Sequence, residues 1–379
     1  MKSHTKHLIQ SACLFATLAL SLPAMANVET SSNHERSLLK RLHALEKKLE
    51  KQIGSQASPL TNRFNVSAVV ELEAFVQDSE NSNNASDASL ATIEVAIHSH
   101  LNPYLEAQVL LLHEDGSDQE LMVDEGFIAL SAQDLPLTLV AGKQVIGFGN
   151  FESHFISDPL TLELAETKDT AIKLQFEHLG FYGSAYVFNG DIEKPDENDE
   201  IKQAGAQLAF VRSNKNTHLE IGLDYISSLA ESETLVDYLQ EKDAGARFKK
   251  TVAAASIHGL LSLNKWQFLA EYISATRAFD ENDLSFSNSG AQPSSYHLEI
   301  SYDFTLLGKA VTVAMAHQQS TEALALELPE KRNMLVASYP LYKSTTFAME
   351  LMQATDYAVK DGGTHNTDYS LNMQLAAEF

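Results

Sequence analysis

Apolar and polar positions alternate in segments of about ten residues from Phe64 to the end of the chain. In 296–304, for example, every even position is apolar or aromatic, and His, Glu, Ser and Asp occupy the odd ones. A period of two is typical of β-strands whose two faces meet different surroundings. Sixteen such segments are predicted, those near 248 and 331 with the softest boundaries. They begin near residues 64, 89, 104, 120, 136, 169, 181, 201, 218, 248, 265, 295, 310, 331, 344 and 368.

The connections between these segments alternate in length. An even number of strands joined by short periplasmic turns and long outer loops is typical of a transmembrane β-barrel. A soluble β-sandwich has little reason to collect its long loops at one end. We therefore predict an all-β fold, a 16-stranded antiparallel transmembrane β-barrel over residues 57–379. The short connections are 102–103, 179–180, 261–264 and 340–343, and the long ones, mostly polar, are 77–88, 147–168, 227–247, 276–294 and 355–367.

The last eleven residues support this prediction, because every odd position from Tyr369 to Phe379 is apolar. The segment resembles the terminal strand of outer-membrane barrels, whose C-terminal aromatic residue is read by the barrel-assembly machinery. Phe379 therefore predicts that machinery and outer-membrane lipid as partners, and the bacterial outer membrane as the location.

Two further segments precede the predicted barrel. Residues 1–26 combine early lysines, a short apolar run and Ala24-Met25-Ala26, which indicates a cleaved secretory signal peptide rather than a membrane helix. In 27–56, leucines at 38, 42, 45 and 49 have the 4-3-4 spacing of a short coiled coil. A seam this short is marginal alone, so we expect it to join a homo-oligomer such as a trimer. The alternative is an amphipathic helix that packs on its own barrel.

Composition excludes several classes of protein. The 51 acidic and 27 basic side chains give a net charge of -24, which argues against nucleic acid as a partner. The single cysteine excludes a disulfide framework and a cysteine-ligated metal site. The mean hydropathy of -0.17 argues against a helical membrane protein, but it fits a barrel whose strands turn half of their side chains to water.

A barrel of this strand number encloses an aqueous lumen, so its inward faces are predicted to be polar. For any single residue, simple solvation of the wall is a more economical explanation than contact with a solute. As a set, these residues make the predicted lumen acidic, with Lys173 an exception. The orientation of Lys143 stays open because 137–141 is apolar on both faces. The candidate pore-lining residues are Glu71, Glu73, Glu94, His98, Glu106, Glu125, Lys173, Gln175, Glu220, Asp224, Glu271, His297, Glu299 and Asp303.

The third predicted extracellular loop, 147–168, is too apolar for a solvated surface loop. We predict that it folds into the lumen and narrows it, as constrictions in channels do. The alternative is a loop that covers the barrel rim or a subunit contact. The candidate constriction residues are Glu152, His154, Asp158, Glu163, Glu166 and Lys168.

Sequence motifs for chemistry are absent. His98 and His100 share one strand face, but no third ligand is identifiable, so no metal site is predicted. A glycine-rich phosphate loop is missing, and no Ser/His/Asp set has motif context. We therefore predict no catalytic residue, no cofactor and no enzymatic activity.

Several segments resemble the LbtU-like siderophore porins of bacterial outer membranes. The resemblance implies a barrel that takes up a ferric siderophore by passive or facilitated diffusion, without the plug domain of energised receptors. Residues 27–61 are independently too short for such a plug. Besides the leucine helix and the closing strand, the matching segments are Val109 to Glu114 (VLLLHE), Val123 to Leu130 (VDEGFIAL), Gly142 to Asn150 (GKQVIGFGN), Ile156 to Thr170 (ISDPLTLELAETKDT) and Gly180 to Asp191 (GFYGSAYVFNGD).

An acidic lumen is in tension with this expectation, because carboxylate-type ferric siderophores are anionic. A general cation-favouring porin is therefore the alternative, and a surface-interaction or adhesion barrel is a third.

Overall fold

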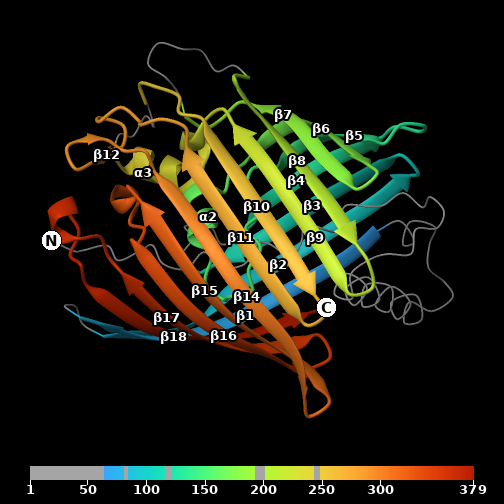
Figure 1. The fold of residues 1–379 in the computed structure, drawn as a ribbon. Coiled ribbons are helices and arrows are strands. Elements are labelled where there is room, and N and C mark those ends of the chain that lie inside the picture. Colours follow the sequence, from blue (N-terminus) through green and yellow to red (C-terminus); the bar gives the residue numbers. More distant parts are fainter. Residues whose placement is uncertain (1–63, 81–83, 116–120, 193–200, 243–247) are drawn as a thin grey trace.

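The computed structural model describes residues 64–80, 84–115, 121–192, 201–242 and 248–379. Sixteen antiparallel strands form a closed barrel in which chain neighbours pair and β1 pairs with β18 (Figure 1). The predicted 16-stranded antiparallel barrel is confirmed. The predicted signal peptide and coiled-coil helix lie outside the described residues.

The barrel strands follow the sequence alternation closely. Their bounds are β1 Phe64–Ser79, β2 Ala85–Asn102, β3 Leu105–Glu114, β4 Met122–Ser131, β5 Leu137–Val145, β6 Lys168–His178, β7 Phe181–Phe188, β8 Gln203–Ser213, β9 Thr217–Ile226, β10 Ala254–Leu263, β11 Trp266–Ala275, β14 Ser294–Leu306, β15 Lys309–Thr321, β16 Lys331–Tyr342, β17 Thr345–Thr355 and β18 Thr367–Glu378. The loops add a hairpin, β12 Ser285–Phe286 and β13 Ser289–Gly290, and the helical segments α2 Leu160–Ala165, η2 Leu229–Glu231, α3 Glu233–Lys242, η3 Leu324–Leu326 and η4 Val359–Asp361.

Two strand starts are wrong in the sequence prediction. The strand expected near 89 begins at Ala85, so β2 extends into the predicted loop 77–88. The segment expected near 248 begins six residues later, because β10 starts at Ala254. Phe248 and Val252 are 1% and 0% exposed, and they pack in a core that the long loops form against the inner side of the wall. The apolar residues of this segment are therefore explained by packing between the loops and the wall, and they do not belong to a strand.

The outer surface of the barrel carries the apolar row of each strand. In β6, Ile172, Leu174 and Phe176 are exposed, whereas Ala171 before them and Lys173 between the first two are buried. An outward apolar band of this kind is the surface that a lipid bilayer covers. None of the described helices is long and apolar enough to cross a membrane.

The same alternation settles the orientation of Lys143 in β5. Val140 and Gln144 are buried on the lumen side, and Leu139 is exposed on the outer side. Lys143 shares the outer row with Leu139, and its Nζ donates to the Val123 carbonyl at 3.1 Å. Lys143 therefore does not line the lumen.

The two ends of the barrel differ. At one end, pairs such as β6 and β7 are joined by two residues, Leu179 and Gly180, with φ of 53° and 83°. Two positive φ values are typical of the tight turns that match strand twist. At the other end lie the long segments, including 146–167, 227–253 and 276–293. We call these the turn end and the loop end.

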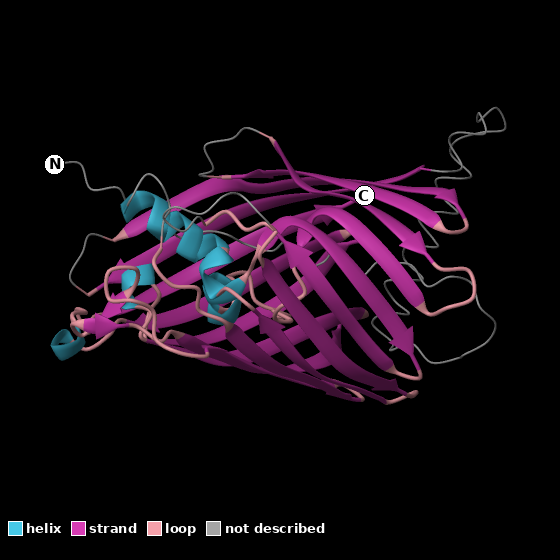
Figure 2. Cartoon of the chain, turned by 90° about the horizontal axis from the view of Figure 1, so that it is seen from above, coloured by secondary structure: helices cyan, strands magenta, loops and turns pink. Residues whose placement is uncertain are grey.

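The main apolar core lies inside the loop end of the barrel. Side chains of segment 146–167, such as Phe148 and Leu160, pack with Leu229 and Leu235 from the next long loop and with wall residues such as Ile273. The helix α2 packs against β11, β14 and β15, and it also contacts α3. The helices gather at this one end (Figure 2). We call this cluster the loop core.

Candidate functional site

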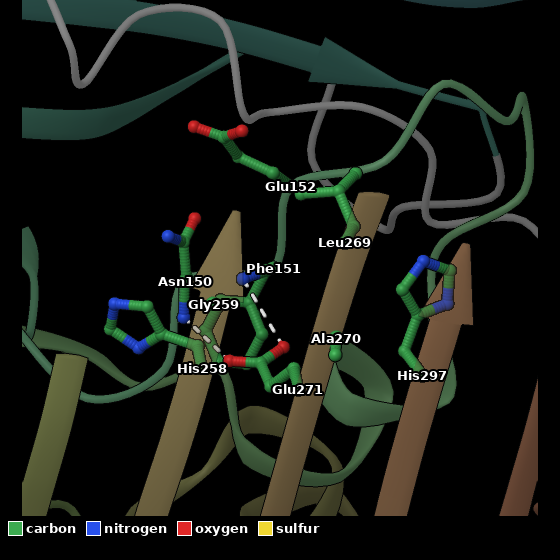
Figure 3. Close-up of a pocket in the computed structure, with 9 residues that line it drawn as sticks. All are labelled: Asn150, Phe151, Glu152, His258, Gly259, Leu269, Ala270, Glu271 and His297. Carbon is green, nitrogen blue, oxygen red and sulfur yellow. Dashed lines mark hydrogen bonds between the residues drawn. The ribbon is translucent and has the colours of Figure 1, made fainter. Parts of the chain in front are cut away.

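Segment 146–167, here called the constriction loop, leaves β5 and runs along the inner wall formed by β9 to β18. Its backbone N–H groups meet carboxylates that point inward from the strands. Gly149 donates to Asp224 Oδ2 of β9 at 3.1 Å, and Asn150 donates to Glu271 Oε1 of β11 at 2.6 Å. Phe151 donates to the second oxygen of Glu271 at 3.3 Å (Figure 3). The first residues of the loop are thus hydrogen-bonded to β9 and β11, two wall strands separated by β10.

The next attachment is Glu299 on β14. Ser153 Oγ donates to Glu299 Oε2 at 3.1 Å, and His154 Nδ1 lies 2.5 Å from Oε1. His297 Nε2 approaches the same carboxylate at 3.1 Å. Burial lowers the pKa of His154, but the hydrogen bond and charge of Glu299 outweigh it, so the net pKa is raised. The backbone N–H of His154 also donates to Oε1 at 3.3 Å, so Glu299 holds the loop through a hydroxyl, an imidazole and a backbone N–H group.

The third attachment is Glu350 on β17, whose side chain is fully buried at 0% exposure. Its Oε2 accepts from the N–H groups of Ile156 at 2.7 Å and Ser157 at 3.1 Å. Its Oε1 accepts from Ser157 Oγ at 2.6 Å and from Asn372 Nδ2 of β18 at 2.8 Å. A carboxylate with this many donors is a strong, charge-assisted anchor.

The only helix in the constriction loop, α2, is fixed by β15 and β16. Leu160 N donates to Gln318 Oε1 at 3.0 Å. Arg332 Nη1 donates to the Asp158 carbonyl at 2.9 Å and to Glu163 Oε1 at 2.8 Å. Arg332 is 2% exposed, so its charge is paired inside the wall and does not face a passing solute.

The end of the constriction loop joins α3 and β4. Thr234 Oγ1 donates to the Glu163 carbonyl, and Glu233 N donates to the Glu166 carbonyl at 2.9 Å. Lys168 Nζ lies 2.6 Å from Asp124 and 3.5 Å from Glu233. Burial, and then the charge of Glu233, raises the pKa of Glu166 to about 8. These groups stabilise the loop end of the barrel by pairing with each other.

Glu152 differs from the other carboxylates of the loop. Its side chain points away from Glu271 and the strands, as Figure 3 shows. The contacts of the described residues include no hydrogen bond to its carboxylate. Burial, and then the charge of Glu220, raises the pKa of Glu152 to about 7. Glu152 is therefore a loop carboxyl group that can change charge near neutral pH.

The wall opposite the constriction loop holds a second set of predicted residues. Glu73 accepts from Gln374 Nε2 at 2.9 Å, and Glu125 accepts from Val145 N at 3.2 Å. Gln175 Nε2 donates to Tyr182 Oη at 3.0 Å, beside the buried Lys173 on the same strand. Glu71 and Glu94 share this inner surface, on β1 and β2.

The structure therefore divides the sequence-predicted residues into three groups. Asp224, Glu271 and Glu299 bind the constriction loop, together with Glu220, whose Oε1 accepts from Asn150 Nδ2 at 3.4 Å, and His297 contacts Glu299. Glu71, Glu73, Glu94, Glu125, Lys173 and Gln175 face it from β1 to β6. His98, Glu106 and Asp303 lie near the turn end, away from the loop; Asp303 accepts from Thr312 Oγ1 at 2.6 Å.

Sequence reasoning missed Glu350, Arg332, Asp124 and His258. His258 lies between Asp224 at 3.3 Å and Glu220 at 3.8 Å. Glu350 was detectable in principle, because it is the one charged residue of β17. Arg332 falls at the start of a segment that alternates poorly, so its inward orientation had no clear sequence indication.

Comparisons with known proteins agree with the fold. No protein-family model matches the chain. A UPF0422 protein of Coxiella burnetii is 26% identical over 332 residues, which cover 84% of this chain and 70% of the relative. A UPF0422 protein of Legionella pneumophila (strain Lens) is 24% identical over 301 residues, which cover 73% of this chain and 56% of the relative. The chain thus spans little more than half of the Legionella protein.

Solved structures similar to this chain are outer-membrane channels. The channel DcaP of Acinetobacter baumannii has a TM-score of 0.59 at 9% identity, covering 83% of this chain and 97% of DcaP. OprB of Pseudomonas putida has a TM-score of 0.59 at 10% identity, covering 84% and 95%. An anion-selective porin from Comamonas acidovorans has a TM-score of 0.54 at 12% identity, covering 83% and 99%. At these identities the likeness shows the porin fold.

Proposed function

We propose that this chain is a diffusion channel of the bacterial outer membrane whose passage is set by the constriction loop. The observation that carries the proposal is the attachment of this loop inside the lumen, by carboxylates from β9, β11, β14 and β17. A closed barrel with an outward apolar band is one of the few structures that satisfies its backbone within lipid. A loop fixed by several strands narrows such a lumen without filling it with a separate domain.

The solute we propose is a ferric siderophore, taken up by passive or facilitated diffusion. This part rests on the sequence resemblance to LbtU-like siderophore porins. Of two of the most specific matching segments, Ile156 to Leu164 lies in the constriction loop, and Phe181–Phe188 forms β7, which runs from the turn end to the loop end. The resemblance thus includes the part of the barrel that would contact a solute.

The charge of the lumen supports a second candidate, a cation-favouring porin. Glu271, Glu299 and Glu350 accept hydrogen bonds from the constriction loop, so much of the predicted acidity serves to hold the loop. Glu152, and the carboxylates of β1 and β2 opposite it, are the groups a solute would meet. This arrangement weakens the conflict with an anionic siderophore, but still favours small cations.

Planar-bilayer recordings of the purified protein test both candidates. For the siderophore channel, an added ferric carboxylate siderophore should reduce the conductance in a concentration-dependent manner, and siderophore-loaded liposomes should exchange it. Conductance that the siderophore never alters, together with no exchange, would refute this solute. Reversal potentials in a potassium chloride gradient separately measure the cation preference, and a preference for chloride would refute the second candidate.

The predicted assembly partners are also proposals. Phe379 N donates to the Ala68 carbonyl at 3.0 Å, and Ala68 N donates to the Phe379 carbonyl at 2.8 Å. Phe379 therefore lies at the seam where β1 and β18 close the barrel, and its side chain is exposed. This position supports recognition by the barrel-assembly machinery. A homo-oligomer such as a trimer rests on the leucine spacing of 38–49 alone.

A further inference from the structure

The hairpin of β2 and β3 brings two imidazoles and a carboxylate together near the turn end of the barrel. The strand register pairs His100 with Glu106 and His98 with Gln108. Gln108 Nε2 donates to the lumen residue Glu125 at 3.3 Å, so this row of side chains faces the lumen. The sequence alone offered His98 and His100 without a third ligand, and the register supplies it.

The donor atoms of this cluster have the spacing of a metal site. His100 Nδ1 lies 3.1 Å from Glu106 Oε1, and His98 Nε2 lies 3.5 Å from Glu106 Oε2. One donor atom from each residue lies within 4.8 Å of the others. Around a tetrahedral zinc ion with bonds near 2.05 Å, neighbouring donors are about 3.3 Å apart. The two carboxylate–imidazole distances bracket that value.

We propose that His98, His100 and Glu106 form a binding site for a divalent transition-metal ion such as Zn²⁺. Two imidazoles and one carboxylate are a donor set that divalent transition metals favour over calcium or magnesium. The two imidazole rings lie edge to face, with centroids 4.4 Å apart, on one strand. Because the paired strands already hold the three side chains together, binding needs no rearrangement of the hairpin.

Two other histidine–carboxylate groups in the lumen do not share these properties. Glu299 already accepts hydrogen bonds from the constriction loop, and the side chain of His258 is 3% exposed between two carboxylates. The side chain of His100 is 53% exposed and that of His98 is 22% exposed. An ion can therefore reach the hairpin from water and keep water ligands in its remaining positions.

The test is Zn²⁺ binding by the purified full-length protein, measured by isothermal titration calorimetry. Replacing His98 or His100 by Gln should weaken Zn²⁺ binding at least tenfold, and the double variant should abolish the site. His317→Gln is the matched control, because His317 lies on β15 and contacts Tyr296 and Asn333 instead. Equal Zn²⁺ affinity in the wild type and the double variant would overturn the proposal, as would no binding by the wild type.

A spectroscopic readout keeps the test informative if a variant folds poorly. Cu²⁺ added to the wild type should show nitrogen hyperfine coupling from two imidazoles, and His100→Gln should reduce it to one. His100 is exposed, so this variant is expected to retain its fold. A spectrum unchanged by His100→Gln would overturn the assignment. Because neither readout measures transport, the site can fail while the channel proposal stands.

Discussion

Replacing Glu350 by Ala should detach the middle of the constriction loop. Glu350 is fully buried and accepts two backbone N–H groups and one hydroxyl from Ile156 and Ser157. The variant leaves those two N–H groups with no acceptor at their present positions. A buried backbone donor without a partner is costly, so the segment is expected to move into the aqueous lumen.

The size of the effect follows from these contacts. A hydrogen bond to a charged group contributes about 1.5–3 kcal/mol, but bonds that share one carboxylate are not additive. The partners of Glu350 are neutral, and each buried donor left without an acceptor costs about 1–3 kcal/mol. If Glu350 contributes about 3 kcal/mol to the free energy that keeps this segment attached, its removal raises the equilibrium constant for detachment about 100-fold.

Thiol labelling measures this equilibrium. Ile156 is 5% exposed, and the one native cysteine, Cys13, precedes the barrel, so Ile156→Cys with Cys13→Ser gives a single reporter. Labelling by a polar thiol reagent should be about 100-fold faster with Glu350→Ala than without it. Gln353→Ala is the matched control, since Gln353 lies on the outer row of the same strand and contacts Tyr369. Equal labelling rates in the two variants would refute the anchoring role.

Three other outcomes are expected. Cation selectivity, measured by reversal potential, should fall as the pH drops through about 7, because Glu152 loses its charge there. Glu152→Gln should remove this pH dependence. The same pH dependence in the variant would exclude Glu152 as its source. The raised pKa of His154 beside Glu299 means that the pair stabilises fully below about pH 6.5 and loses its contribution as the pH rises through the folded-state value. The melting temperatures of wild type and His154→Gln should therefore differ most at low pH and converge at high pH, and a constant difference would contradict this. At Gly142, with φ of 141°, an added Cβ would lie 2.2 Å from the Gly126 carbonyl oxygen. Gly142→Ala should therefore destabilise the barrel by about 1–3 kcal/mol, which would lower the temperature at which the protein shifts from its folded to its unfolded position on a gel. An unchanged transition temperature would contradict the close approach.

The barrel could be predicted from sequence because the surroundings of a strand residue depend on whether its position is odd or even. Lipid outside and water inside require opposite side chains, so Leu298 and Glu299 already indicate the two faces of β14. Tight turns and long loops then give the two ends. This local rule needs no knowledge of which strands are neighbours across the lumen.

The contacts of the constriction loop could not be predicted in the same way. Ser157 and Glu350 are 193 residues apart. The sequence also contains several inward-facing carboxylates, and nothing in it distinguishes those that bind the loop from those that do not. Only the closed barrel shows that Glu350 lies under the loop while Glu106 lies near the turn end. The strand expected near 248 failed for a related reason, because Phe248 joins the loop core instead of the wall.

The long separation of these contacts has a consequence for biogenesis. The constriction loop follows β5, but its anchors are on β9, β11, β14 and β17, so the loop cannot be fully attached until most of the later strands have been added. Closing such distant contacts carries a chain-entropy cost that is met late in folding. We expect a nascent barrel to be more permeable than the finished one, so its release before the last strands join would leave a leak in the membrane.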